Sequence, residues 1–301
     1  MISTLPIADL GRRPLVMGII NVTPDSFAGD GLLRGSNYVD CAVKQARKMV
    51  ADGADILDIG GESSRPGSET IGVEEEIRRV SPVVRALHEE LPTVPISVDT
   101  VKPSVAGAAL AVGASIINDI SGEDQNPAML LLAASSGAYL VLMHNRSCSE
   151  AVTRHEKIGG EYHAPSYDDV IKEIREELKI RAQRAIAIGV APGRIILDPG
   201  LGFGKTVEQN LRLMNELDQL KSLGYPVLAG PSRKSFIGRV LDLPVEERME
   251  GTAAAIAACV LRGASILRVH DVKEMTRVVK MTAAILGASP EDQCASAQLR
   301  A

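Results

Sequence analysis

Polar side chains follow a series of short aliphatic runs in this sequence, and four of them combine carboxylate, amide and ammonium chemistry. They are Asp99, Asn118, Asp198 and Lys234. Packing does not explain apolar strands that end in polar groups, because a buried polar group needs a partner. The carboxylates and the amide could bind a heterocycle with several N–H donors, such as a 2-amino-4-oxo-pyrimidine edge. Lys234 could bind a ring acceptor and hold the carboxylates ionised. The alternative is an ion-pair network that closes the end of the fold.

A second group of polar residues is cationic. Arg268 and His270 lie two residues apart in an extended run and therefore share a face. With Arg65 and Asn21 they form a rim suited to a diphosphate, because the fork of an arginine matches phosphate oxygens. Asn21 offers a neutral oxygen, which suits a Mg²⁺ ion that is shared with substrate phosphates and stays mostly hydrated. His270 has no second His or Cys at ligand spacing, so zinc is not expected.

Two further motifs carry weaker signals. Ser235 stands where a helix is expected to begin, and unpaired backbone N–H groups there favour an anion, so Ser235 could hold a carboxylate. Serine at a helix start is more often only a cap. The stretch 200–206 (GLGFGKT) lacks the G-x-x-x-x-G-K-[ST] spacing of a nucleotide-binding loop. We interpret Phe203 within it as a flat wall.

The polar residues lie at the ends of runs that have the character of buried strands. Each run is short, rich in β-branched residues and bounded by Gly, Pro or Asp. The runs are 15–22, 55–61, 95–100, 115–120, 138–144, 194–200, 226–231 and 265–272. Segments with helical spacing alternate with them, among them 73–90 and 168–188. Strand and helix repeated eight times predict an α/β fold, a (β/α)₈ or TIM barrel in a single domain.

The expected barrel covers residues 15–286, after a lead-in of 1–14 and before a tail of 287–301. Two long polar loops, 23–37 and 62–72, follow the first two strands, and barrels place their chemistry on such loops. These two are therefore candidate lids. A third stretch, 145–167, follows the fifth strand; it is expected to be irregular, and no role is assigned to it.

Composition narrows the class of protein further. Hydrophobic residues make up 45% of the chain and aromatic residues only 3%, so the core must be aliphatic. The formal charge of −5 argues against general binding of nucleic acid. The four cysteines have no ligand or disulfide spacing and suggest reduced thiols. No apolar stretch is long enough to span a membrane, so a soluble cytoplasmic protein is expected.

With these residues in view, the sequence resembles the dihydropteroate synthase family. The resemblance lies in motifs that span most of the chain in the order that the family has. They are MGIINVTPDSF (17–27), DIGGESSRPGS (58–68), ISVDT (96–100), IINDISG (116–122), LMHNR (142–146), ILDPGLGFGKT (196–206), SRKSFIG (232–238) and RVHDV (268–272). Each motif alone is weak, whereas the eight together are specific.

The resemblance implies roles for the residues singled out above. The family joins 6-hydroxymethyl-7,8-dihydropterin pyrophosphate to para-aminobenzoate, with Mg²⁺, and is commonly a homodimer. The implied pterin residues are Asp99, Asn118, Met143, Asp198, Phe203 and Lys234. The implied pyrophosphate residues are Asn21, Ser64, Arg65, Arg268 and His270, with Mg²⁺ at Asn21. The implied para-aminobenzoate residues are Phe27, Ser64, Pro66 and Ser235, with Arg65 beside them, in a pocket that also takes sulfonamides. Catalysis would fall to Arg65, Lys234, Arg268 and His270.

Two departures from the family pattern leave alternatives open. The first loop reads Ala28-Gly29-Asp30-Gly31, which displaces its acidic residue by one, and position 64 is Ser where many members have Thr. A non-catalytic pterin-binding paralogue with an altered lid would fit this loop. The pterin-binding domain of a methyltetrahydrofolate–corrinoid methyltransferase is a second alternative. It would need no pyrophosphate site, and the SRKSFIG motif and the cationic rim argue against it.

Overall fold

The computed structural model describes residues 10, 13–23, 37–64, 68–122, 126–147, 152–163 and 165–287. Phe27, Asp30, Arg65 and Pro66 lie outside the described residues, as do almost all of the predicted lead-in and tail.

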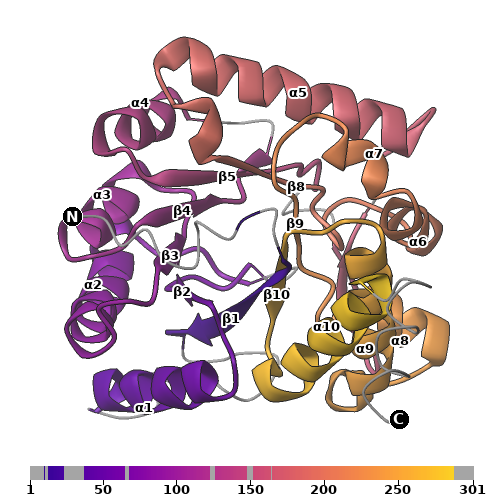
Figure 1. The fold of residues 1–301 in the computed structure, drawn as a ribbon, viewed down its shortest axis with the longest axis horizontal. Coiled ribbons are helices and arrows are strands. Elements are labelled where there is room, and N and C mark those ends of the chain that lie inside the picture. Colours follow the sequence, from indigo (N-terminus) through magenta and orange to yellow (C-terminus); the bar gives the residue numbers. More distant parts are fainter. Residues whose placement is uncertain are drawn as a thin grey trace, which may run out of the picture.

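In the part of the chain that the structure describes, eight parallel strands form the centre of the molecule (Figure 1). They are β1 (Leu15–Asn21), β2 (Ile56–Gly60), β3 (Ile96–Asp99), β4 (Ile116–Asp119), β5 (Tyr139–Met143), β8 (Ile195–Asp198), β9 (Leu228–Ala229) and β10 (Ile266–Val269). They pair in the order β8-β5-β4-β3-β2-β1-β10-β9. A parallel bridge between Leu197 and Val227 joins the two edges of this sheet. Each predicted run contains one strand, and the predicted (β/α)₈ barrel is confirmed.

Helices surround the strands (Figure 1). They are α1 (Tyr38–Ala51), α2 (Val73–Glu90), α3 (Pro103–Ala111), α4 (Pro127–Ser136), α5 (Val170–Ile188), α6 (Val207–Asn215), α7 (Asp218–Lys221), α8 (Ser235–Leu241), α9 (Met249–Leu261) and α10 (Val272–Gly287). The predicted helix 73–90 has the bounds of α2. The predicted helix 168–188 begins two residues late as α5, because the Asp169 side chain accepts from the backbone N–H groups of Ile171 and Lys172 and caps it.

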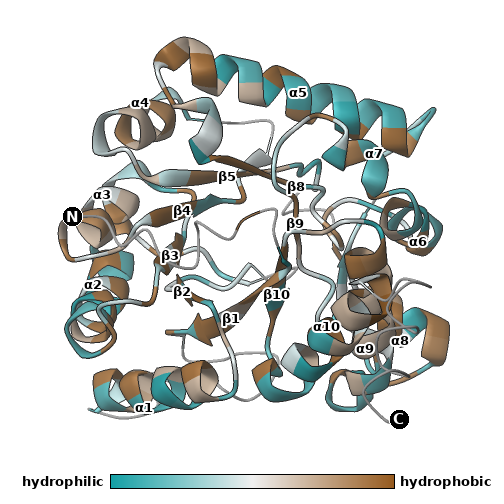
Figure 2. Cartoon of the chain, in the orientation of Figure 1, coloured by the Kyte–Doolittle hydropathy of each residue, from teal (hydrophilic) through white to brown (hydrophobic). Residues whose placement is uncertain are grey.

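Two apolar layers hold the barrel together. The larger layer packs the outer faces of the strands against the helices, and the outer helices in Figure 2 alternate between hydrophobic and hydrophilic residues. The smaller layer fills the barrel interior and consists of Leu15, Met17, Ile56, Ile116, Val141, Ile196, Leu228 and Ile266. Two residues further along four of these strands stand Asp58, Asn118, Asp198 and Arg268. Because side chains alternate along a strand, these polar groups also point inward, one layer closer to the carboxyl ends of the strands.

The stretch 145–167 differs from the prediction of irregular structure, which was wrong. It contains an antiparallel hairpin of β6 (Val152–His155) and β7 (Gly159–Tyr162), in which Val152 pairs with Tyr162 and His155 with Gly159. The left-handed Gly159, with φ of 89°, helps the chain to reverse. The strands are short and polar, so they lack the aliphatic runs that identified the barrel strands.

None of the helices that the structure describes is long and apolar enough to cross a membrane.

Candidate functional site

A two-part cavity opens at the carboxyl ends of the strands. The inner part, about 20 Å³, has Asp99, Asn118, Met143 and Asp198 in its lining. The outer part, about 110 Å³, has Asn21, Ser235 and His270 in its lining. Ser64, Phe203, Lys234 and Arg268 line both parts, and Asp99 also reaches the outer one. The structure therefore brings together every predicted site residue that it describes; Phe27, Arg65 and Pro66 lie outside the described residues.

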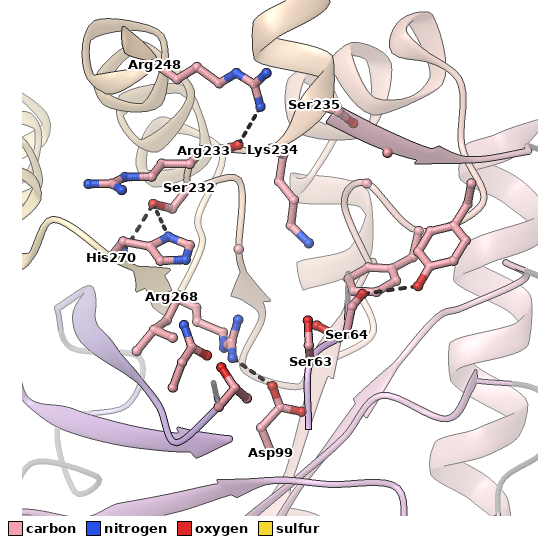
Figure 3. Close-up of a pocket in the computed structure, with 18 of the residues that line it drawn as sticks. Ser63, Ser64, Asp99, Ser232, Arg233, Lys234, Ser235, Arg248, Arg268 and His270 are labelled. Carbon is pink, nitrogen blue, oxygen red and sulfur yellow. Dashed lines mark hydrogen bonds and ion pairs between the residues drawn. The ribbon is translucent and has the colours of Figure 1, made fainter. Parts of the chain in front are cut away.

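Arg268 bridges two carboxylates at the floor of the cavity. Its Nε donates to Asp58 at 2.7 Å. Its Nη2 donates to Asp99 at 2.8 Å, and this second contact is drawn in Figure 3. The Asn118 amide also donates to Asp58, at 3.3 Å. Arg268 was predicted on a rim that binds a diphosphate, next to His270. The guanidinium contacts Asp58 and Asp99 through Nε and Nη2, and Arg268 also lines the outer part of the cavity together with His270.

Burial dominates the electrostatics of the inner cavity. It raises the pKa of Asp198 to about 6, although the Gly200 N–H donates to the carboxylate at 2.7 Å. Burial also raises the pKa of Asp99, and the attraction of Arg268 opposes that shift. Burial works against the charge of Arg268, but Asp58 and Asp99 outweigh it, so the pKa of Arg268 is raised. The floor therefore holds buried carboxylates, and an N–H donor that reaches them would stabilise their ionised form.

Lys234 extends into the pocket between the sides that carry Arg268 and Ser64 (Figure 3). Its Nζ lies 4.1 Å from the centre of the Phe203 ring, within the range of a cation–π contact. Burial, followed by repulsion from Arg268, lowers the pKa of Lys234 to about 8. Lys234 was predicted to hold the carboxylates ionised. The charge of Lys234 does lower the pKa of Asp99 and of Asp198, although burial raises both by more. The direct ion pair with Asp99 is made by Arg268.

Phe203 lies in the loop after β8. The backbone at the start of this loop has a conformation that requires glycine. Gly200 has φ of 66°, and a Cβ placed there would lie 1.9 Å from the His144 carbonyl oxygen. The buried Lys205 ammonium fixes the loop from within, because it donates at 2.9 Å to the carbonyls of both Gly200 and Phe203 and lies 3.1 Å from His144 Nδ1. Burial lowers the pKa of Lys205 to about 7. Lys205 was not predicted from the sequence, because its partners are backbone carbonyls, which residue types and spacing do not reveal.

The cationic rim is organised by the segment that follows β9. Ser232 Oγ accepts from the backbone N–H of His270 at 3.2 Å and lies 3.1 Å from its Nδ1 (Figure 3). When the hydroxyl donates to Nδ1, the ring proton resides on Nε2. Arg233, with a left-handed φ of 58°, turns its guanidinium to Asp271 at 2.5 Å. This turn precedes Ser235, where α8 begins, as the sequence predicted.

A wall that the sequence did not predict closes the outer cavity. Ile158, Gly160 and Tyr162 of the β6–β7 hairpin line it, together with the buried Arg248. Tyr162 stacks on Phe203, with ring centres 6.0 Å apart and planes inclined by 24°. The signal available in the sequence was an aromatic residue within a polar loop of a chain that has only 3% aromatic residues.

The described residues contain no group of three or more His, Cys, Asp or Glu side chains that could hold a metal ion. Asn21 ends β1 and lines the outer cavity with a neutral carboxamide. Such a donor fits a Mg²⁺ ion that takes most of its ligands from substrate phosphates and water.

Comparison with known proteins identifies the class to which this barrel belongs. Residues 17–270 match the family described as pterin binding enzyme. The dihydropteroate synthase of Bacillus subtilis is 47% identical over 275 residues, which cover 91% of this chain and 90% of that protein. The dihydropteroate synthase of Synechocystis is 45% identical over 278 residues, which cover 92% of each chain.

Solved structures give the same result. The dihydropteroate synthase of Xanthomonas albilineans with 4-aminobenzoic acid aligns with a TM-score of 0.81 at 41% identity. The same enzyme with 7,8-dihydropteroate aligns with a TM-score of 0.76 at 38% identity, and both alignments cover 92% of this chain and 94% of the other. The fold and the site thus define a pterin-binding (β/α)₈ enzyme. Within that class, the chain belongs to the dihydropteroate synthase family.

Proposed function

We propose that the chain condenses 6-hydroxymethyl-7,8-dihydropterin pyrophosphate with para-aminobenzoate to give 7,8-dihydropteroate and pyrophosphate. The bond between the pterin methylene carbon and the pyrophosphate oxygen breaks, the aniline nitrogen bonds to that carbon, and the nitrogen releases a proton. The observation that carries the proposal is the meeting of Asp99, Asn118, Asp198 and Lys234 in one cavity of a family member.

The floor of the cavity suits the donor edge of a pterin. Asn118 Oδ1, in the lining of the inner cavity, is a buried acceptor without a hydrogen-bond partner among the described residues. An unsatisfied buried acceptor is costly, so a ligand N–H that reaches it binds favourably. Asp99 and Asp198 add carboxylate acceptors at the same depth, whereas Lys234 donates to a ring acceptor. Phe203 and Met143 provide apolar surface for the flat ring.

The cations above this floor suit the leaving group. Departure of pyrophosphate moves negative charge onto phosphate oxygens, and pre-placed donors stabilise charge that develops in the transition state. Lys234, Arg268 and the imidazole of His270 face this part of the cavity. Arg65, outside the described residues, is proposed to join them. Catalysis then depends on stabilising the leaving group and on holding the aniline in line with the methylene carbon.

Mg²⁺ is part of this proposal, with Asn21 as its protein ligand. When bound, the ion would neutralise pyrophosphate charge. The role of Asn21 is to supply one carboxamide oxygen and so to fix the register of the diphosphate.

The outer cavity is proposed to hold para-aminobenzoate. Ser235 stands at the start of α8, where a hydroxyl and backbone N–H groups can bind a carboxylate, and Ser64 lies on the opposite side. Phe27 and Pro66, outside the described residues, complete this subsite in the proposal.

The experiment that tests the function combines purified protein, the dihydropterin pyrophosphate, Mg²⁺ and para-aminobenzoate, and measures both products. Each substrate is omitted in turn. We expect both products in equal amounts from the wild type and a large loss of rate in Lys234→Ala. Lys172→Ala, an exposed lysine of α5, is the matched control. Tight pterin binding without any pyrophosphate release would instead favour a non-catalytic pterin-binding paralogue.

We further propose that two copies of the chain associate through α6, α8 and α9. Leu211, Val240, Leu241, Met249 and Leu261 on these helices are exposed apolar side chains. Several of them line a groove of about 430 Å³ with a mostly apolar lining. Exposed apolar surface of this kind favours a protein partner, and the family resemblance favours a second copy. Light scattering tests the proposal: Leu261→Glu should shift the mass from dimer to monomer.

The proposed location is the cytoplasm, supported by the free thiols of Cys41 and Cys259, the cysteines among the described residues. Free thiols persist in reducing compartments.

A further inference from the structure

The β6–β7 hairpin connects three parts of the active-site mouth that come from distant segments of the chain. It leaves the barrel after β5 and lies beside α8, to which β7 is packed. Glu161 forms an ion pair with Arg239 of α8 at 2.7 Å, and Lys157 forms one with Asp242 at 2.7 Å. These two ion pairs join the hairpin to α8 and to the residue that follows it.

A buried arginine ties the tip of the hairpin to the segment that presents Lys234 and Ser235. Arg248, only 1% exposed, donates to the Ile158 carbonyl at 2.9 Å and to the Arg233 carbonyl at 3.0 Å. Figure 3 shows the second of these contacts, directly above the pocket. A displacement of the hairpin would therefore disturb the start of α8 as well.

Tyr162, at the end of β7, reaches the other two parts of the mouth. Its ring stacks on Phe203 of the loop after β8, and its hydroxyl donates to the Ser64 carbonyl at 3.1 Å. Ser64 belongs to the loop after β2. Burial raises the pKa of the Tyr162 hydroxyl, so the group stays a protonated donor. Tyr162 thus joins the aromatic wall of the pocket to the backbone of the second loop.

The position of Tyr162 indicates which substrate it meets. The inner cavity, with the carboxylates and the amide, includes no residue of the hairpin, whereas the outer cavity includes Ile158, Gly160 and Tyr162. Phe203 lines both cavities, so the stacked pair extends one apolar surface from the inner part to the outer part. A flat aromatic ring in the outer cavity would pack against that extension, because aromatic pairs favour stacked or edge contacts.

We propose that Tyr162 is a binding and positioning residue for the aromatic second substrate, and that its hydrogen bond to Ser64 sets the width of that subsite. The inference rests on the proposed function, with para-aminobenzoate as the ring concerned. It adds to the subsite a wall supplied by the hairpin after β5.

The test measures the KM of each substrate separately, together with kcat and Tm, for the wild type and three variants. Tyr162→Leu removes the ring but keeps apolar volume, and Tyr162→Phe removes only the hydrogen bond. Tyr38→Phe is the matched control, because the Tyr38 hydroxyl also donates to a backbone carbonyl at 3.1 Å, on the outer surface between α1 and α2.

We expect Tyr162→Leu to raise the KM for para-aminobenzoate about tenfold, from lost aromatic contact and buried area. Tyr162→Phe should raise it about threefold, the usual range for one neutral hydrogen bond. The KM for the pterin pyrophosphate should change less than about twofold in both, and Tyr38→Phe should resemble the wild type.

The outcomes separate the inference from the function on which it rests. If the wild type turns over and the two Tyr162 variants keep the wild-type KM for para-aminobenzoate, the inference is wrong and the proposed function stands. Equal changes in both KM values would also overturn it, since they would indicate general disruption of the mouth. If Tyr162→Leu does not fold, Tyr162→Phe decides alone. Absence of turnover in the wild type overturns both proposals.

Discussion

We expect Asp198 to lower the free energy of unfolding and also to bind the pterin. The variant Asp198→Asn should reveal both effects. The carboxyl is 6% exposed, and its pKa rises from 3.8 to about 6 on burial. At 1.36 kcal/mol per pKa unit, the ionised group destabilises the folded state by about 3 kcal/mol above pH 6. Asparagine keeps an oxygen that can accept from the Gly200 N–H. Some of the gain is lost because Lys234 no longer has this charge nearby.

The sign of the pH dependence follows from the raised pKa. Well below pH 3.8 the group is protonated in both the folded and the unfolded chain, so Asp198→Asn should match the wild type in stability. Between about pH 4 and pH 6 only the unfolded chain ionises, and the wild type progressively loses stability relative to the variant. Above pH 6 the difference should stay constant, at up to about 3 kcal/mol.

Urea denaturation from pH 4 to pH 8 measures this difference, with the exposed Asp40→Asn on α1 as the control. Calorimetric titration with a pterin at pH 7.5 measures the second effect, for which we expect about tenfold weaker binding or more, because a charged acceptor is lost. A stability difference that does not change with pH would refute the electrostatic reasoning. Unchanged pterin affinity would refute the role of Asp198 at the site.

Three further changes test other parts of the structure. Gly200→Ala should lower the free energy of unfolding by several kcal/mol more than Gly137→Ala, since both residues have left-handed φ but only the first would place a Cβ against backbone; urea denaturation compares them. Arg268→Met should cost about 3–5 kcal/mol because two buried carboxylates lose their partner, whereas the exposed pair of Arg13 should be worth at most about 1 kcal/mol; equal losses would contradict this. Lys234→Ala should weaken pterin binding in calorimetry, and an unchanged affinity would mean that the pocket is misassigned.

The fold could be predicted because short aliphatic runs, which indicate buried strands, alternate in the sequence with segments of helical spacing. The aliphatic runs predicted all eight strands. Ile196 and Asp198 illustrate why the polar residues at the strand ends predicted the site. The apolar residue fills the barrel, and the polar residue two positions later points inward one layer higher. Once the barrel is closed, such positions on different strands must meet.

The sequence could not predict which partner a long side chain would contact. The strand spacing placed Arg268 on the face that it shares with His270, but its guanidinium reaches far enough to select the buried Asp58 and Asp99. Lys205 was missed for a related reason: its partners are backbone carbonyls, which carry no signature in the sequence. The hairpin was missed because its strands pair through polar residues, and its importance depends on contacts with Phe203 and Ser64 that are remote in the chain.

The most direct test of the central claim follows the carbon that changes partners. The dihydropterin pyrophosphate is labelled with ¹³C at its exocyclic methylene and incubated with the wild-type protein, Mg²⁺ and para-aminobenzoate, and the products are analysed by mass spectrometry and NMR. The proposed function predicts that the label appears in 7,8-dihydropteroate, bonded to nitrogen, with one pyrophosphate released per product. The proposed function would be contradicted if the label stayed in the dihydropterin pyrophosphate or ended in the free hydroxymethyl pterin.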